Sequence, residues 1–186
     1  MWPAIDILGA GGSSLSPHSR SSGFTTIELL IGVAIVGILA SVAVPSFKSY
    51  VYRGRVAEAV TMLNKIKTRQ EAYRSRFGQY AAVNGDDWGA YTPAAIPGEN
   101  PVIWPSSPGW EELGVSSPGY VRFRYATVAG APEVAPPAGS NLDNSTFWYA
   151  AQAEGDLDGD GDTMILEVYS QSRRMFNSAA GRGGWE

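Results

Sequence analysis

The sequence contains no cysteine, and its single histidine, His18, lies near the amino terminus. The missing cysteines exclude a disulfide framework and any thiol chemistry. Most metal-hydrolase, serine-triad and thiol-nucleophile mechanisms are also excluded, because they depend on imidazole or thiolate. Catalysis by carboxylates alone remains chemically open, but no pair of acidic residues stands out for it. We therefore expect a protein that is not an enzyme.

Charge is nearly absent from one segment, since Glu28 is the only ionisable side chain between Phe24 and Phe47. About 20 predominantly apolar residues cross a bilayer core as a helix, so this run predicts a membrane-spanning helix. A lone carboxylate near the bilayer centre costs on the order of 3 kcal/mol. Two interpretations of Glu28 follow: it reaches interfacial water, or it is kept for a partner, such as a free amino terminus created by cleavage after Gly23.

The residues around Glu28 resemble the processing site of type IV pilins and of the related pseudopilins of type II secretion. They read Gly23-Phe24-Thr25-Thr26-Ile27-Glu28-Leu29-Leu30. In that family a prepilin peptidase cleaves after the glycine, and the new terminus is N-methylated. The resemblance implies cleavage after Gly23, methylation of Phe24 and an assembly role for Glu28. It also places Gly37 and Pro45 where such helices carry a glycine and a helix-loosening proline.

An ordinary secretory signal is the alternative for this segment. Its cleavage site would be Ser41-Val42-Ala43, and the mature protein would begin at Val44. The glutamate at the front of the apolar core argues against this alternative, as does the helical pattern that continues beyond it. Lys48, Arg53 and Arg55 follow the span, which by the positive-inside rule would leave the carboxyl-terminal body in the cytoplasm. The pilin resemblance implies the opposite orientation.

A basic helix and an acidic head follow the apolar run. Apolar residues recur at intervals of three, four or seven up to Phe77, which indicates an amphipathic helix that Pro45 kinks without ending. Residues 48–76 contain eight basic and two acidic residues, a net charge of +6, whereas residues 78–186 contain fourteen acidic and five basic residues, a net charge of −9. The basic helix could pack subunits, attract anionic lipid or simply face solvent. Nucleic-acid binding is not expected of the acidic head.

The head is predicted to be a sheet preceded by a long loop. Residues 78–119 are rich in glycine, proline and serine, and their tryptophans are expected to anchor the loop on the core. Strand patterns cover residues 120–128, 147–153 and 164–169, and a last short strand is expected near 174–176. The expected fold is α+β and pilin-like: a long amino-terminal helix, half transmembrane and half amphipathic, packed on three or four antiparallel strands. The expected divisions are a leader (1–23), a transmembrane and assembly helix (24–47), an amphipathic helix (48–77) and a head (78–186).

An acidic loop separates the second and third expected strands. From Asp156 to Glu167 the chain matches the calcium-loop pattern D-x-[DN]-x-[DN]-G-x5-E, with further carboxylates at Asp158, Asp160 and Asp162. The flanks are predicted strands, so Glu167 reaches such a site only if the chain bends suitably. A solvated Asp/Gly turn without metal is the alternative. Because four neighbouring carboxylates repel one another without a cation, we favour a structural calcium ion.

These features favour a structural subunit of a type IV pilus-like filament. The resemblance implies processing by prepilin peptidase, residence of the precursor in the inner membrane, and polymerisation with copies of the same chain or related pilin subunits into an extracellular filament on the cell surface. In that mechanism the amine of Phe24, from a neighbour or from the same chain, neutralises Glu28. The alternatives are a pseudopilin of a type II secretion system and a membrane-anchored calcium-binding adhesin.

Overall fold

The computed structural model describes residues 23–178, and its first element is the long helix α1 (Thr26–Phe77). The helix begins where Thr25 Oγ1 accepts the backbone N–H of Glu28 at 3.2 Å, which satisfies one of the free amides of the first turn. It ends at Gly78, which has φ = 76° and donates its N–H to the Arg74 carbonyl at 2.8 Å. Pro45 lies inside the helix without ending it. The predicted helix to Phe77 is confirmed.

The chain separates into two compact units, Met1–Val42 and Ala43–Glu186. The described part of the first unit is the start of α1, in which every side chain is exposed. Its most apolar window has a mean hydropathy of 2.6, so by length and composition α1 is able to cross a membrane. The predicted transmembrane segment therefore has the required length, composition and helical structure.

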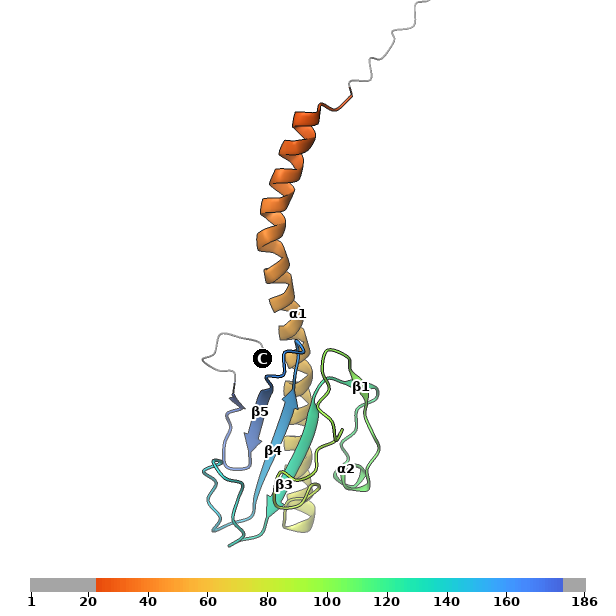
Figure 1. Ribbon diagram of the computed structural model, residues 1–186. Helices are drawn as coiled ribbons and strands as arrows, with labels where there is room; N and C mark the ends of the chain where they lie inside the picture. Colours follow the sequence, from red (N-terminus) through yellow and green to blue (C-terminus); the bar gives the residue numbers. More distant parts are fainter. Residues whose placement is uncertain (1–22, 179–186) are drawn as a thin grey trace, which may run out of the picture. The chain divides into compact units, whose positions relative to one another are not determined.

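The second unit combines the rest of α1 with an antiparallel sheet, as Figure 1 shows. Four strands are paired in the order β3-β4-β5-β6, and β1 pairs with β2 in a separate two-stranded sheet. This arrangement confirms the predicted α+β class. The elements after α1 are β1 (Val102–Ile103), α2 (Pro108–Leu113), β2 (Tyr120–Val121), β3 (Arg124–Gly130), β4 (Trp148–Gly155), β5 (Met164–Tyr169) and β6 (Phe176–Asn177).

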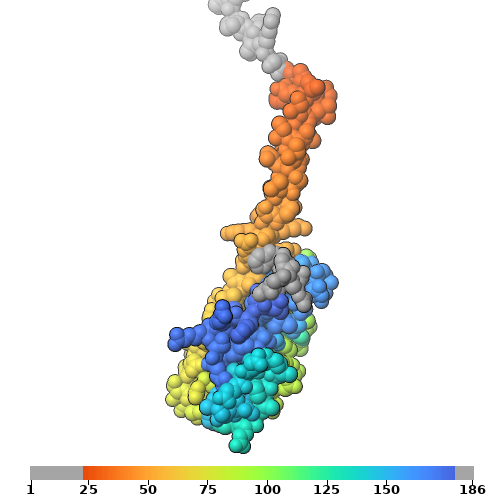
Figure 2. Space-filling model, turned by 90° about the vertical axis from the view of Figure 1, so that its left-hand side faces the viewer, coloured from red at the N-terminus to blue at the C-terminus, as the bar shows by residue number. Residues whose placement is uncertain are grey.

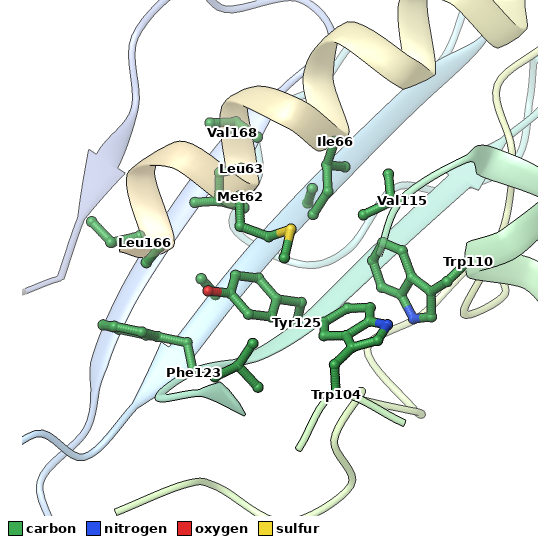
Figure 3. Packing of buried hydrophobic residues seen from close by; sticks show 14 of the residues in the cluster. Met62, Leu63, Ile66, Trp104, Trp110, Val115, Phe123, Tyr125, Leu166 and Val168 are labelled. Carbon is green, nitrogen blue, oxygen red and sulfur yellow. The ribbon is translucent and has the colours of Figure 1, made fainter. Parts of the chain in front are cut away.

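The main core lies between α1 and one face of the four-stranded sheet (Figure 3). Ala59, Leu63 and Ile66 of α1 are fully buried there. Trp104 and Trp110 reach the same core from the long loop, with their ring centroids 5.4 Å apart. The predicted anchoring role of these two tryptophans is confirmed.

The expected strand over residues 120–128 is divided between two sheets. Tyr120 and Val121 pair with β1, whereas β3 begins at Arg124 and pairs with β4. The interruption coincides with a tertiary contact, because the backbone N–H of Arg122 is donated to Glu58 Oε1 of α1 at 2.8 Å. The strand is also not half-buried as predicted, since every residue from 125 to 129 is buried. The last expected strand lies slightly later than predicted, at β6.

Candidate functional site

The predicted processing site lies at the start of the described chain. Gly23 is exposed and precedes α1, and the Phe24 side chain is 79% exposed. Glu28 lies in the first turn of α1 with its side chain exposed, where the helix dipole favours a negative charge. The rest of the predicted leader, residues 1–22, lies outside the described residues. A peptidase could reach the bond after Gly23 without unfolding a helix.

The apolar half of α1 offers hydrophobic side chains in every direction. Gly37 lies in this half. A Cβ atom added at Gly37 would have no other atom within 4 Å, apart from its chain neighbours and the adjacent helix backbone. A helix that is hydrophobic all round needs lipid or other helices as its environment. Its large apolar side chains are 53% to 69% exposed: Ile27, Leu29, Leu30, Ile31, Val33, Ile35, Val36, Ile38, Leu39, Val42, Val44 and Phe47.

The acidic loop gathers three of the predicted ligands. Carboxylate oxygens of Asp156, Asp158 and Asp160 lie within 4.8 Å of one another. Asp156 also accepts the backbone N–H groups of Gly159 at 2.7 Å and Gly161 at 3.2 Å. Both glycines have positive φ, 78° and 93°, which a side chain would oppose. The loop is therefore shaped by its own hydrogen bonds as well as by its charges.

Asp158 is the least satisfied member of this group. One of its carboxylate oxygens is buried and has no hydrogen-bond partner. Burial, followed by the nearby charge of Asp160, raises the pKa of the Asp158 carboxyl. A bound cation would instead lower the pKa of this carboxyl, because it would stabilise the charged form.

The two remaining predicted ligands are not part of this group. Asp162 is exposed and donates its backbone N–H to Asp160 at 2.8 Å. Glu167 lies within β5, where its carboxylate accepts hydrogen bonds from Gln152 Nε2 at 2.7 Å and the Tyr169 hydroxyl at 2.6 Å. Glu167 pairs in register with Gln152 of β4, and it is not among the carboxylates that converge in the described part of the chain.

Glu99 is an acidic neighbour of the loop that sequence reasoning missed. A Cβ built on Gly159 would lie 3.4 Å from Glu99 Cγ and 3.8 Å from Glu99 Cδ. Glu99 belongs to the long segment between α1 and β1, so no local spacing connects it with the aspartates. Only the folded chain brings it beside them.

The loop is attached firmly to the head. Leu157 is fully buried in the main core, and its carbonyl accepts a hydrogen bond from Arg55 Nη1 of α1 at 2.6 Å. The conformation of the acidic loop is therefore coupled to the packing of the head against its own part of α1.

A family model and several known proteins each match part of the chain. Residues 18–44 match the family model described as the prokaryotic N-terminal methylation motif. The fimbrial protein of Moraxella nonliquefaciens is 42% identical over 90 residues, which is 45% of this chain and 58% of that protein. The major pilin PilA of Myxococcus xanthus is 44% identical over 64 residues, 34% of this chain and 29% of that protein.

A major pilin of Neisseria gonorrhoeae, PilE1, is 39% identical over 82 residues, 44% of this chain and 50% of that protein. The chain thus spans between 29% and 58% of the length of these three relatives. No solved structure gives a significant match.

The described chain is an α+β protein in which the predicted processing site is exposed and precedes a helix that is able, by length and composition, to span a membrane. The chain carries the prokaryotic N-terminal methylation motif at residues 18–44 and is similar, over part of its length, to type IV pilins.

Proposed function

We propose that this chain is a structural subunit of a type IV pilus-like filament on the cell surface. The precursor resides in the inner membrane with the apolar half of α1 in lipid, and prepilin peptidase removes the leader after Gly23. The observation that carries this proposal is the exposed methylation-motif helix. Its apolar surface requires a second environment once it leaves the bilayer, and the same helices of neighbouring copies or related pilin subunits supply it.

Glu28 has a specific role in this proposal. It is the only charge in the apolar run, and an unpaired carboxylate among packed apolar helices is costly. The amine of Phe24, freed by cleavage, neutralises it in the assembled filament. A charged pair of this kind fixes the position of one subunit against the next, because a displaced subunit would leave the carboxylate unpaired.

The experiment replaces Glu28 and follows three separate steps. Glu28→Ala is expected to leave leader removal and membrane insertion intact and to abolish incorporation into filaments. Mass spectrometry of the amino terminus checks the first step, membrane fractionation the second, and electron microscopy of sheared surface material the third. Asp86→Ala, at an exposed carboxylate of the head, is the matched control and should assemble normally.

Two results would contradict the proposal. Normal filaments from the Glu28→Ala protein would exclude the pairing role. Absence of the wild-type chain from every sheared fibre would instead favour the membrane-anchored adhesin, which needs no polymer.

A further inference from the structure

Glu167 lies beside a cavity of about 370 Å³ on the face of the sheet away from α1. The cavity lies between β5, the segment that follows it, and residues 139–142 of the loop joining β3 to β4. Figure 2 shows the side of the head on which β5 and β6 lie, with the loop that joins β3 to β4 in cyan beside the blue segment that contains these strands. The volume is large enough for a small organic molecule and much larger than a single metal ion requires.

The carboxylate in this cavity is held in place but has no counter-charge there. Glu167 is partly buried and accepts hydrogen bonds from two neutral groups, Gln152 Nε2 and the Tyr169 hydroxyl. Gln152 is in turn hydrogen-bonded by the Tyr91 hydroxyl. None of the described residues that line the cavity is basic. A partly buried negative charge of this kind favours a cationic ligand.

Two further features make the cavity resemble a binding site. Ser140 is one of the residues that line it, and the Ser140 hydroxyl is buried without a hydrogen-bond partner, although buried polar atoms are nearly always paired. Its neighbours Gly139 and Asn141 have positive φ, 83° and 51°. Asparagine adopts this left-handed conformation more readily than other residues with a side chain, so both residues suit the tight turn of this wall.

The walls indicate which kind of cation fits. Phe176 is 47% exposed at the cavity, and its ring lies 5.3 Å from that of Tyr169. Aromatic rings attract ammonium groups through their faces, and they also contact the carbon skeleton of an organic ligand. A hard metal ion would require six to eight oxygen ligands, which a single carboxylate among aromatic walls does not supply.

We propose that this cavity binds a small organic molecule with a primary ammonium group. Glu167 accepts the ammonium, and Tyr169 and Phe176 contact the carbon skeleton of the ligand. None of the described residues that line the cavity belongs to α1.

The test uses the full chain in detergent micelles and ligand-observed NMR titrations with two matched pairs of probes. Glucosamine is compared with glucose, and butylammonium with butanol. We expect each ammonium probe to bind and each neutral probe not to bind. Binding of only one ammonium probe would support the proposal and show whether the skeleton is a sugar or an alkyl chain. Equal binding within both pairs, or no binding of either ammonium probe, would overturn it.

Variants separate binding from folding. Glu167→Gln keeps the size and an acceptor oxygen, and should raise the Kd of the ammonium probes at least about tenfold. Glu112→Gln, at a separate cavity beside Tyr73, is the matched control and should bind normally. Unchanged binding by a folded Glu167→Gln protein would contradict the assignment.

Discussion

At the scale of single residues, two polar side chains of α1 fix the helix against the head. Gln70 is fully buried, donates to the Ala81 carbonyl at 2.8 Å and accepts the Ala81 N–H at 2.9 Å. Glu58 accepts the Arg122 N–H at 2.8 Å and the Tyr125 hydroxyl at 3.4 Å. The helical pattern singles out neither residue, because polar side chains of an amphipathic helix are expected to face water.

Glu58 leads to a prediction about pH. Burial raises the pKa of its carboxyl, and this effect is opposed by the Arg122 N–H. The folded protein therefore holds this proton at pH values where the unfolded chain has released it. Consequently the contribution of Glu58 to the free energy of unfolding falls as pH rises from about 4.3, the ordinary glutamate value, to the raised folded value.

Glu58→Gln should remove this loss of stability with rising pH, and it keeps an acceptor oxygen for the backbone N–H of Arg122. Thermal unfolding should be measured from acid to neutral pH. At pH 7 the variant should be at least as stable as the wild type, and the difference in stability between the two proteins should be smaller at acidic pH. Glu112→Gln is the control and should follow the wild-type profile. A wild-type protein that gains stability over the variant as pH rises would contradict the assignment.

At the scale of elements, sequence patterns succeeded where the interactions are local. The extent of α1 and both ends of β5 were predicted correctly, because periodicity and flanking turn residues define them. The prediction of a single strand over residues 120–128 was wrong. This segment is divided into β2 and β3, and the division depends on the distant Glu58 and on pairing with β1. The pattern also could not show that loops bury the outer face of β3, where Val128 packs near Trp88 and Val134.

The acidic loop shows the same division between local and distant information. Its three converging aspartates follow from alternate spacing and from glycines with positive φ. Glu167 satisfies the spacing of the calcium pattern but lies in a strand that continues past the loop, and Glu99 takes a place beside Gly159. A linear motif specifies spacing, whereas the ligand set depends on where the flanking elements run.

The expected structural calcium ion stays a prediction with a direct test. Calcium added to metal-free protein should raise the thermal transition, because a ligand that binds only the folded state stabilises it, by about 2.7 kcal/mol at one hundred times its Kd. Asp158→Asn should lose most of this effect, and Asp86→Asn should retain it. If calcium leaves the wild-type transition unchanged, the hydrogen bonds to Asp156 hold the loop without metal.

At the scale of the whole molecule, α1 contributes residues to both compact units, and its two parts differ in burial. Its first part is exposed throughout, whereas its fully buried residues begin at Ala59. The core of the head therefore uses only the later turns of the helix, together with the sheet and the anchoring tryptophans.

This division predicts that a fragment from Ala43 to Glu186 folds independently. It should remain soluble without detergent and unfold in one cooperative transition when followed by circular dichroism. Leu63→Ala, which empties a fully buried position facing the sheet, should destabilise the fragment by about 2 to 5 kcal/mol. The same substitution should cost the full chain in detergent a similar amount. A fragment without a cooperative transition, or a much smaller cost in the full chain, would show that the apolar half of α1 supports the head.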